Sequence, residues 1–165
     1  MGNNILTKDS VNAAARKFLT SDQLYKNSAI DEMFSDQPAL MELLKYIDKA
    51  IHNEMTKEVT IQLMCIFYKA FATQHVKFKK IDFDEILKLI SKTTEMKKYL
   101  HSPNHVFDGK AFGKFIEQYR QKEILNYTHF ALNNQFIQLI TSEQEALFIF
   151  YMMKTYGEAL DANMI

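Results

Sequence analysis

Few residues in this chain could carry acid–base or metal chemistry, and the imidazoles are the first to consider. Two of them, His101 and His105, are four residues apart, a spacing that on a continuous helix places both on one face to bind a metal ion. Pro103 lies between them and interrupts a helix, so we expect a loop there and no metal site. The other imidazoles lie far apart in the sequence, at His52, His75 and His129.

Carboxylates are the second source of chemistry. Asp82, Asp84 and Glu85 lie close together, but a calcium loop needs alternating oxygen ligands, a central glycine and a terminal glutamate, which do not occur here. Their place before a periodic apolar segment predicts helix capping, with Asp82 and Glu85 at capping-box spacing. Asp48 and His52 are four residues apart, yet no second histidine completes a ligand set. We therefore expect a local hydrogen bond or a solvated pair, and no cofactor.

The one candidate thiol nucleophile is Cys65, which lies between Met64 and Ile66 in a strongly apolar segment. Burial raises the pKa of such a thiol and makes it inert, so the pattern predicts a core residue. No serine stands in a nucleophile-elbow pattern, and no glycine-rich phosphate-binding pattern occurs. The sequence therefore favours a protein that is not an enzyme; the alternative is an enzyme whose site is assembled from distant helices.

The charge balance gives no overall attraction to a polyanion. Lysine plus arginine and aspartate plus glutamate are equal, at 20 each, and only Arg16 and Arg120 are arginines. Because duplex recognition relies on guanidinium contacts to phosphate and guanine, we do not expect nucleic acid as a partner. A locally basic face is expected at Lys77, Lys79 and Lys80, where the alternative to a phosphate or acidic-partner contact is a solvated helix exterior.

The elements that must position these residues are helices. The 4 glycines and 2 prolines leave little material for turns, and apolar residues recur at spacings of three and four along most of the chain. The expected fold class is all-α: a single domain over residues 1–165, built as an irregular bundle of about six or seven helices with a frayed tail at 161–165. The expected helices cover residues 8–19, 29–34, 38–54, 57–75, 83–100, 108–139 and 142–160, with a bend or break near 121–123.

Capping residues set several of these expected starts. Ser28 precedes the segment 29–34, and Thr56 precedes the segment 57–75. Pro38 follows a run of capping residues and is tolerated in a first helical turn. Ser142 and Glu145 have capping-box spacing before the last helix, and Asp108 precedes the segment 109–139.

Two of the expected helices, 57–75 and 142–160, are apolar on nearly every side, which predicts that they lie at the centre of the fold. A shift of 85 residues places Thr56 on Thr141, and the helix before each cap also aligns. The sequence therefore suggests a duplicated helical hairpin, with pseudo-repeats at 38–75 and 123–160. The alternative is that two capped helices of similar length share this much by chance.

The last helix carries more large apolar residues than one buried face requires. Three interpretations stay open: a seam between two subunits, central burial in one chain, or a pocket for an apolar ligand. The residues concerned are Leu147, Phe148, Phe150, Tyr151 and Met152.

These patterns lead to a ranked expectation of function. The first is a non-enzymatic helical protein-interaction module, either a homodimer or a small regulator that binds another protein. The second is a binder of an apolar small molecule or acyl chain, which would use adaptable methionine and phenylalanine side chains. The longest apolar runs, 63–68 and 146–153, are too short to span a bilayer, and no secretory signal precedes them, so we expect a cytoplasmic protein.

Overall fold

The computed structural model describes residues 5–100 and 109–165. These residues form nine α-helices and no β-strand, which confirms the all-α prediction, although the helix count is higher than expected. The helices are α1 (Lys8–Thr20), α2 (Gln23–Asp36), α3 (Leu40–Ala50), α4 (Glu54–Thr73), α5 (Phe83–Leu100), α6 (Gly109–Gln118), α7 (Lys122–Leu132), α8 (Gln135–Ile140) and α9 (Glu143–Ala162).

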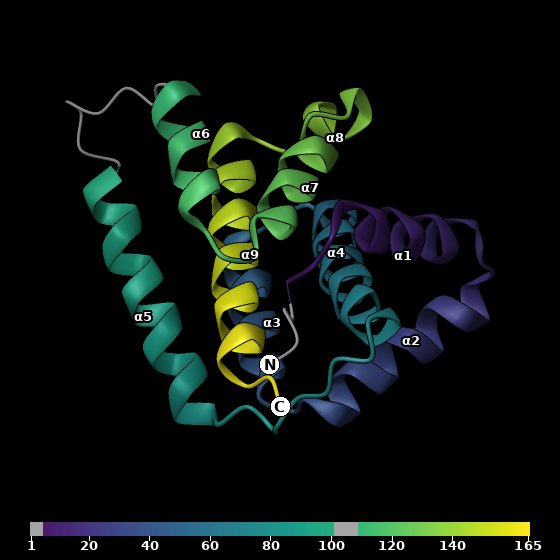
Figure 1. The fold of residues 1–165 in the computed structure, drawn as a ribbon. Coiled ribbons are helices and arrows are strands. Elements are labelled where there is room, and N and C mark those ends of the chain that lie inside the picture. Colours follow the sequence, from purple (N-terminus) through teal and green to yellow (C-terminus); the bar gives the residue numbers. More distant parts are fainter. Residues whose placement is uncertain (1–4, 101–108) are drawn as a thin grey trace.

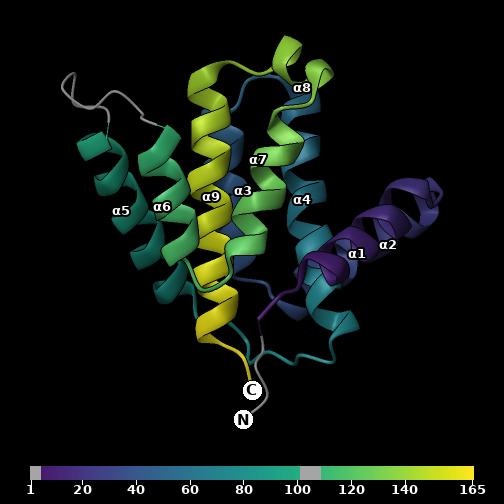
Figure 2. The same ribbon diagram turned by 45° about the horizontal axis from the view of Figure 1, so that its top comes forward.

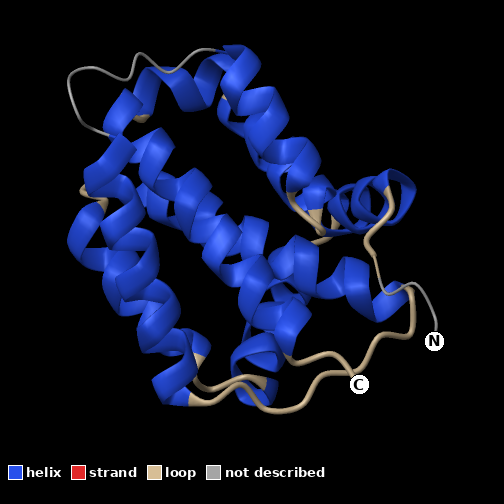
Figure 3. Cartoon of the chain, turned by 60° about the vertical axis from the view of Figure 1, so that its left-hand side comes forward, coloured by secondary structure: helices blue, strands red, loops and turns tan. Residues whose placement is uncertain are grey.

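The two longest helices, α4 and α9, form the centre of the molecule, as their all-round apolar pattern predicted (Figures 1 and 2). In Figure 2 both run downward, with α3 behind them and α7 in front. α1 and α2 lie on one side of this centre, and α5 and α6 lie on the other. A third view shows that short loops join most of the helices (Figure 3).

Residues 23–36 form one continuous helix, so the helix predicted over 29–34 is present but its predicted start and its predicted cap are wrong. Asp22 caps α2, because its carboxylate accepts the N–H of Tyr25 at 2.9 Å. Ser28 therefore lies inside the helix and caps nothing. Its neighbour Ala29 and, one turn later, Met33 are buried in the core, which anchors this part of the helix.

The next two helix starts also differ from the expected caps. α3 begins after a turn that contains Pro38, and no side chain caps it. α4 is capped by Asn53, whose side-chain oxygen accepts the N–H of Thr56 at 3.1 Å. Thr56 lies in the first turn instead, fully buried, and its hydroxyl is 3.0 Å from that of Thr141. Packing against a distant segment thus takes the hydroxyl away from the capping role that the local pattern predicted.

The segment over 108–139, predicted as one bent helix or as two helices that meet near 121–123, contains α6, α7 and α8. The first break lies at residues 119–121, close to the interruption expected near 121–123, because Gln121 turns its side chain into the interior and is fully buried. The predicted cap Asp108 lies outside the described residues, as do His101, Pro103 and His105.

One of the two predicted capping boxes is present. In the first turn of α9, Ser142 Oγ accepts the N–H of Glu145, and the Glu145 carboxylate accepts the N–H of Ser142, both at 3.1 Å. At the start of α5, Asp82 accepts the N–H of Asp84 at 2.8 Å. Glu85 does not reach back to complete a box there; its carboxylate accepts hydrogen bonds from the Asn163 amide at 3.0 and 3.1 Å.

The tail was expected to fray, and this prediction is wrong. α9 continues to Ala162, and the residues after it pair with the connection between α4 and α5. Lys79 N–H donates to the Asn163 carbonyl at 2.8 Å, and Ile165 N–H donates to the Lys77 carbonyl at 2.9 Å. These bonds satisfy backbone groups that a frayed tail would expose to water.

Two buried glutamines hold loops against the helix bundle. Gln37 accepts the N–H of Ile81 at 2.9 Å and donates to the Lys79 carbonyl at 3.0 Å. Gln121 accepts the N–H of Leu6 at 3.0 Å and donates to the Asp161 carboxylate at 2.6 Å. Each amide therefore satisfies polar groups that lie far away in the sequence.

Among the described residues, none of the helices has both the length and the apolar composition needed to cross a lipid bilayer.

Candidate functional site

The apolar residues singled out on α9 lie largely inside this chain. Phe148, Phe150, Tyr151 and Met152 are each at most 4% exposed, and Leu147 is half-buried. The Phe148 ring stacks on Tyr46 of α3 at a centroid distance of 5.7 Å. A subunit seam on α9 would need these side chains at the surface, whereas the chain's own helices cover them.

Tyr151 is the one of these residues with an unsatisfied polar group. Its hydroxyl is buried and has no hydrogen-bond partner in the described part of the chain. Burial raises the pKa of Tyr151 to about 12, so the phenol stays protonated at neutral pH. An uncharged, enclosed phenol with no base beside it is a packing residue, and it gives no support to an acid–base site.

The predicted basic face is exposed, but it is not uniformly basic. Lys77, Lys79 and Lys80 are all exposed. Lys77 and Lys80 line a hollow of about 510 Å³ whose wall also carries Glu32 and Asp36. Carboxylates in the same hollow reduce its attraction for a phosphate group.

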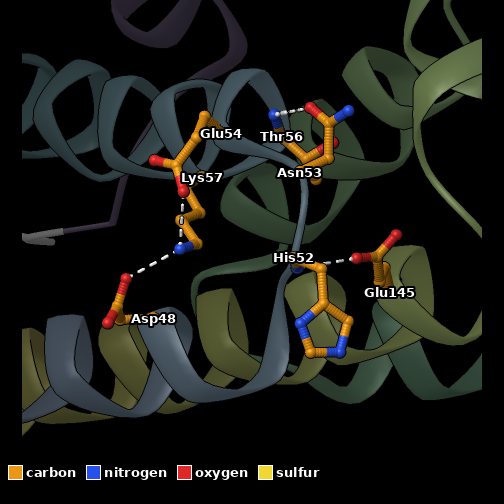
Figure 4. Close-up of polar contacts among 7 residues, drawn as sticks. All are labelled: Asp48, His52, Asn53, Glu54, Thr56, Lys57 and Glu145. Atoms are coloured by element: carbon orange, nitrogen blue, oxygen red, sulfur yellow. Dashed lines mark hydrogen bonds and ion pairs between the residues drawn. The ribbon is translucent and has the colours of Figure 1, made fainter.

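The pair Asp48 and His52 makes no direct contact that could orient an imidazole (Figure 4). Asp48 accepts a hydrogen bond from the Lys57 ammonium at 2.8 Å, which lowers the pKa of this fully solvated carboxyl. The His52 backbone N–H donates to the Glu145 carboxylate at 3.1 Å, and its ring points away from that contact (Figure 4). The contacts around this pair join α3, α4 and α9 and do not form a ligand set.

The remaining candidates for chemistry are also dispersed. Within the described residues, no group of three or more histidine, cysteine or acidic side chains is close enough to hold a metal ion. His75 follows the end of α4 with a φ of 58°, and it is exposed. Cys65 is fully buried, and burial raises the pKa of its thiol to about 12, which confirms the prediction of an inert core residue.

A solvated aromatic ring lies on α7. Phe130 is 73% exposed, and its ring lies 5.9 Å from that of Tyr127 between centroids. Tyr127 in turn packs edge-on against the buried Phe67 at 6.0 Å, which connects this surface to the core. Leu19, at the end of α1, is 54% exposed nearby.

Phe130 borders a hollow of about 440 Å³ between α1, α4, α7 and α8, which we call the Phe130 groove. Its apolar walls come from Leu19, Leu63, Ile66, Tyr127, Phe130 and Ile137, and its polar lining comes from uncharged glutamine and asparagine side chains. A second hollow of about 570 Å³ lies between α1 and α7, and Tyr127 and Phe130 line both. The ring of Phe130 therefore stands between two depressions of the surface.

Sequence reasoning did not identify Phe130. The periodic apolar stripe of this segment runs through Ile124, Leu125 and Leu132, and Phe130 lies on a different face of the same helix. An aromatic residue off the buried stripe was the signal, but its exposure depends on how α1, α4 and α8 pack around it.

A further hollow of about 650 Å³ lies where α7, α8 and the start of α9 meet. Leu147 and Phe150, two of the five residues predicted for an interface or apolar pocket, line it together with Leu132. His129, Asn133 and Glu143 supply polar groups. This hollow joins an apolar wall to a few polar side chains, which is the usual composition of a small-molecule site.

Comparison with known protein families, with curated proteins and with solved structures finds no match to this chain.

Proposed function

We propose that this protein is a non-enzymatic helical interaction module that associates with a second copy of itself through the Phe130 groove. The observation that carries the proposal is the placement of a 73% exposed aromatic ring beside an uncharged apolar hollow on the same face. A protrusion and a hollow on one surface can pair reciprocally about a twofold axis, which is the commonest symmetry of soluble oligomers.

The energetics favour covering this face. Removing apolar surface from water stabilises a complex by roughly 25 cal/mol per Å², and aromatic anchors seated in pockets dominate the energetics of interfaces. No Asp, Glu, Lys or Arg lines the Phe130 groove, so an entering ring meets no charge that would have to lose its water. An uncharged aromatic ring therefore fits the groove better than a charged segment does.

The proposal places the protein in the cytoplasm. Its one cysteine is a buried thiol, and a chain without disulfides suits a reducing compartment.

The test is the solution mass of Phe130→Asp, measured by light scattering over a range of concentrations. We expect the wild type to form a dimer, and the substitution to raise its dissociation constant roughly 30-fold or more, because a hot-spot ring is replaced by a charge. Phe83→Asp is the matched control, since Phe83 is 51% exposed at the start of α5, away from the groove. A wild type that stays monomeric at every concentration contradicts self-association and leaves an apolar segment of another protein as the occupant to seek.

A second candidate function is the binding of an apolar small molecule or acyl chain, and the hollow lined by Leu147 and Phe150 favours it. A ligand retained through purification and detected by native mass spectrometry would support it. Leu147→Trp should then abolish retention, because the larger side chain occupies the hollow, while Leu139→Trp, on the exposed face of α8, should not. Equal retention by both variants would exclude the hollow as the site.

A further inference from the structure

Two contacts join residues that are 85 or 86 positions apart. The Thr56 and Thr141 hydroxyls meet at 3.0 Å at the upper ends of α4 and α9, as Figure 2 is drawn. Phe78 and Met164 form an antiparallel bridge just beyond the lower ends of the same helices. When a molecule has twofold symmetry, residues on the axis touch their own symmetry mates. The two contacts therefore mark both ends of an approximate axis that runs between α4 and α9.

Two glutamine contacts join the parts of the chain on either side of this axis, one in each direction. Gln37, just before α3, accepts the N–H of Ile81, just before α5. Gln121, just before α7, accepts the N–H of Leu6, just before α1. Each half of the chain thus uses a buried glutamine to hold the first residues of the other half.

The backbone pattern at these points is the same in both halves. Leu40 N–H donates to the Gln37 carbonyl and Ile124 N–H donates to the Gln121 carbonyl, both at 3.0 Å. In Figure 2 a half-turn about a vertical line between α4 and α9 brings α3 onto α7, and the pair α1 and α2 onto the pair α5 and α6. α8 has no separate helix as its counterpart, because residues 51–53 connect α3 directly to α4.

The burial pattern agrees with this correspondence. The buried residues of α1 are Val11, Ala14, Ala15 and Phe18. A shift of 75 residues, the spacing between Leu6 and Ile81, places them on Ile86, Leu89, Ile90 and Thr93 of α5, three of which are buried and one half-buried. The correspondence thus extends beyond the hairpin to the helices that flank it.

The same correspondence relates the Phe130 groove to a site in the other half of the chain that the Tyr46 ring fills. In the first half, Tyr46 of α3 stacks on Phe148 of α9 and shares a 2.8 Å hydrogen bond with the hydroxyl of Thr94 on α5. Gln37 and Gln121 are 84 residues apart, and at this spacing Tyr46 falls on Phe130. The spacing of 85 between Thr56 and Thr141 places Phe148 on Leu63, and the spacing of 75 between Leu6 and Ile81 places Thr94 on Leu19. Phe130, Leu63 and Leu19 all line the groove. Tyr46 is partly buried in its site, whereas Phe130 is 73% exposed beside the corresponding hollow.

We infer that the chain consists of two copies of one helical unit related by an approximate twofold axis. The Phe130 groove is then the unfilled counterpart of the site that the Tyr46 ring fills, and we call these two sites the seats. The occupant of the groove is an aromatic ring, the Phe130 ring of a second copy. The identity of this occupant rests on the proposed function, whereas the equivalence of the two seats does not.

The difference between the two seats has a chemical cause. Tyr46 is held in place by the hydroxyl of Thr94, but the counterpart of Thr94 is Leu19, which offers no hydrogen bond. Phe130 likewise carries no hydroxyl. Both polar partners that fasten the ring in the first half are thus replaced by apolar groups in the second, and the resulting groove has no charged lining residue. An apolar ring from outside is the complementary occupant.

The test restores the missing pair in the full-length chain with the double variant Leu19→Thr, Phe130→Tyr. The introduced ring should fold into its own groove, as Tyr46 does, and give NMR cross-peaks to the Leu63 methyl groups. The midpoint of thermal unfolding should rise by about 3 °C beyond the sum of the two single substitutions, as expected for one added hydrogen bond in a chain of this size. The same variant should lose the dimer, because the groove is filled internally.

Tyr46→Phe serves as the mirror control and should lower the midpoint, since the hydrogen bond that the Tyr46 hydroxyl donates to Thr94 is lost. A double variant without coupling between the substitutions and without cross-peaks to Leu63 would overturn the equivalence of the seats. A monomeric wild type whose double variant still shows the coupling would overturn only the second copy as occupant, and with it the proposed function. A dimer that survives the double variant, despite the cross-peaks, would show that the ring does not enter through this groove.

Discussion

At the scale of single residues, the distance between two packed segments determines which side chain a position can hold. Tyr119 and Ile124 pack against the backbone of Gly157 on α9, and Tyr119 donates a hydrogen bond to the Lys154 carbonyl at 3.0 Å. The absence of a side chain at Gly157 is what lets the turn between α6 and α7 lie directly on α9.

Gly157→Ala should therefore destabilise the protein. The added Cβ would lie 2.9 Å from Ile124 Cδ1 and closer still to the Tyr119 hydroxyl, so the Tyr119 contact must shift. We expect a loss of about 1–3 kcal/mol in the free energy of unfolding, the usual cost of overpacking, measured by urea denaturation. Gly113→Ala in α6 is the control, because its Cβ meets nothing within 4 Å and alanine has the higher helix propensity. Equal effects of the two substitutions would contradict the close approach.

Two buried tyrosines of α9 should respond oppositely to loss of the hydroxyl. Tyr156 donates to the Met64 carbonyl at 2.7 Å, whereas the Tyr151 hydroxyl has no partner among the described residues. Tyr156→Phe should lower the free energy of unfolding by about 1–2 kcal/mol, and Tyr151→Phe should leave it unchanged or raise it by up to ~1 kcal/mol. Thermal unfolding of the two variants side by side provides the comparison. A loss in Tyr151→Phe that matches the loss in Tyr156→Phe would mean that the Tyr151 hydroxyl is satisfied.

At the scale of elements, the helix starts show how local signals and distant contacts combine. Ser142 caps α9 as its spacing with Glu145 predicted, whereas Thr56 gives up the predicted capping role and meets Thr141. Glu145 makes both a local and a long-range hydrogen bond. Its carboxylate accepts the N–H of Ser142 in its own first turn and that of His52 after α3.

The stability that Glu145 contributes should depend on pH. Partial burial acts to raise the pKa of this carboxyl, but the N–H groups of Ser142 and His52 outweigh it and hold the pKa below its ordinary value. The carboxylate form is therefore favoured by folding: its contribution is full above the unfolded pKa of about 4.3 and is lost as the pH falls through the lower folded value. Glu145→Gln should lower the thermal midpoint at pH 7, and the difference from the wild type should shrink towards pH 3.

Glu143→Gln, in the same helical turn but exposed, is the control for general charge effects at the helix N-terminus. A difference between wild type and Glu145→Gln that stays constant from pH 7 to pH 3 would show that the charged form of Glu145 is not the one stabilised.

At the scale of the whole molecule, the two glutamine contacts hold the halves of the chain together. Gln37 and Gln121 are at most 2% exposed, and each fastens the start of the opposite half. Because their partners are themselves buried or partly buried, removing an amide leaves backbone groups without hydrogen bonds.

Gln37→Leu and Gln121→Leu should each lower the free energy of unfolding by about 1–3 kcal/mol, since each leaves a buried backbone N–H, of Ile81 or of Leu6, without its acceptor. Urea denaturation measures the loss, and Gln144→Leu, at an exposed site on α9, should change it little. A large effect of one substitution and none of the other would argue against equivalent roles in the two halves.

The sequence by itself determined the all-α class, the two central helices, the inert Cys65 and the capping box at Ser142. These features depend on local propensity and on periodicity, which a single chain displays directly. The continuous α2 and the separate α8 were not foreseen, although a bend or break near 121–123 was, because helix ends depend on packing partners as much as on caps.

Only the tertiary structure decided which apolar side chains stay at the surface. Periodicity indicated that Phe148 and Tyr151 exceed what one buried face requires, yet α3, α5 and other helices cover them. Phe130 was not predicted to lie at the surface, and it is exposed. The paired tail and the reciprocal contacts of Gln37 and Gln121 likewise join residues far apart in the chain. Exposure and long-range hydrogen bonding are properties of the assembled bundle, because they depend on which helices meet, and no spacing within one helix encodes that.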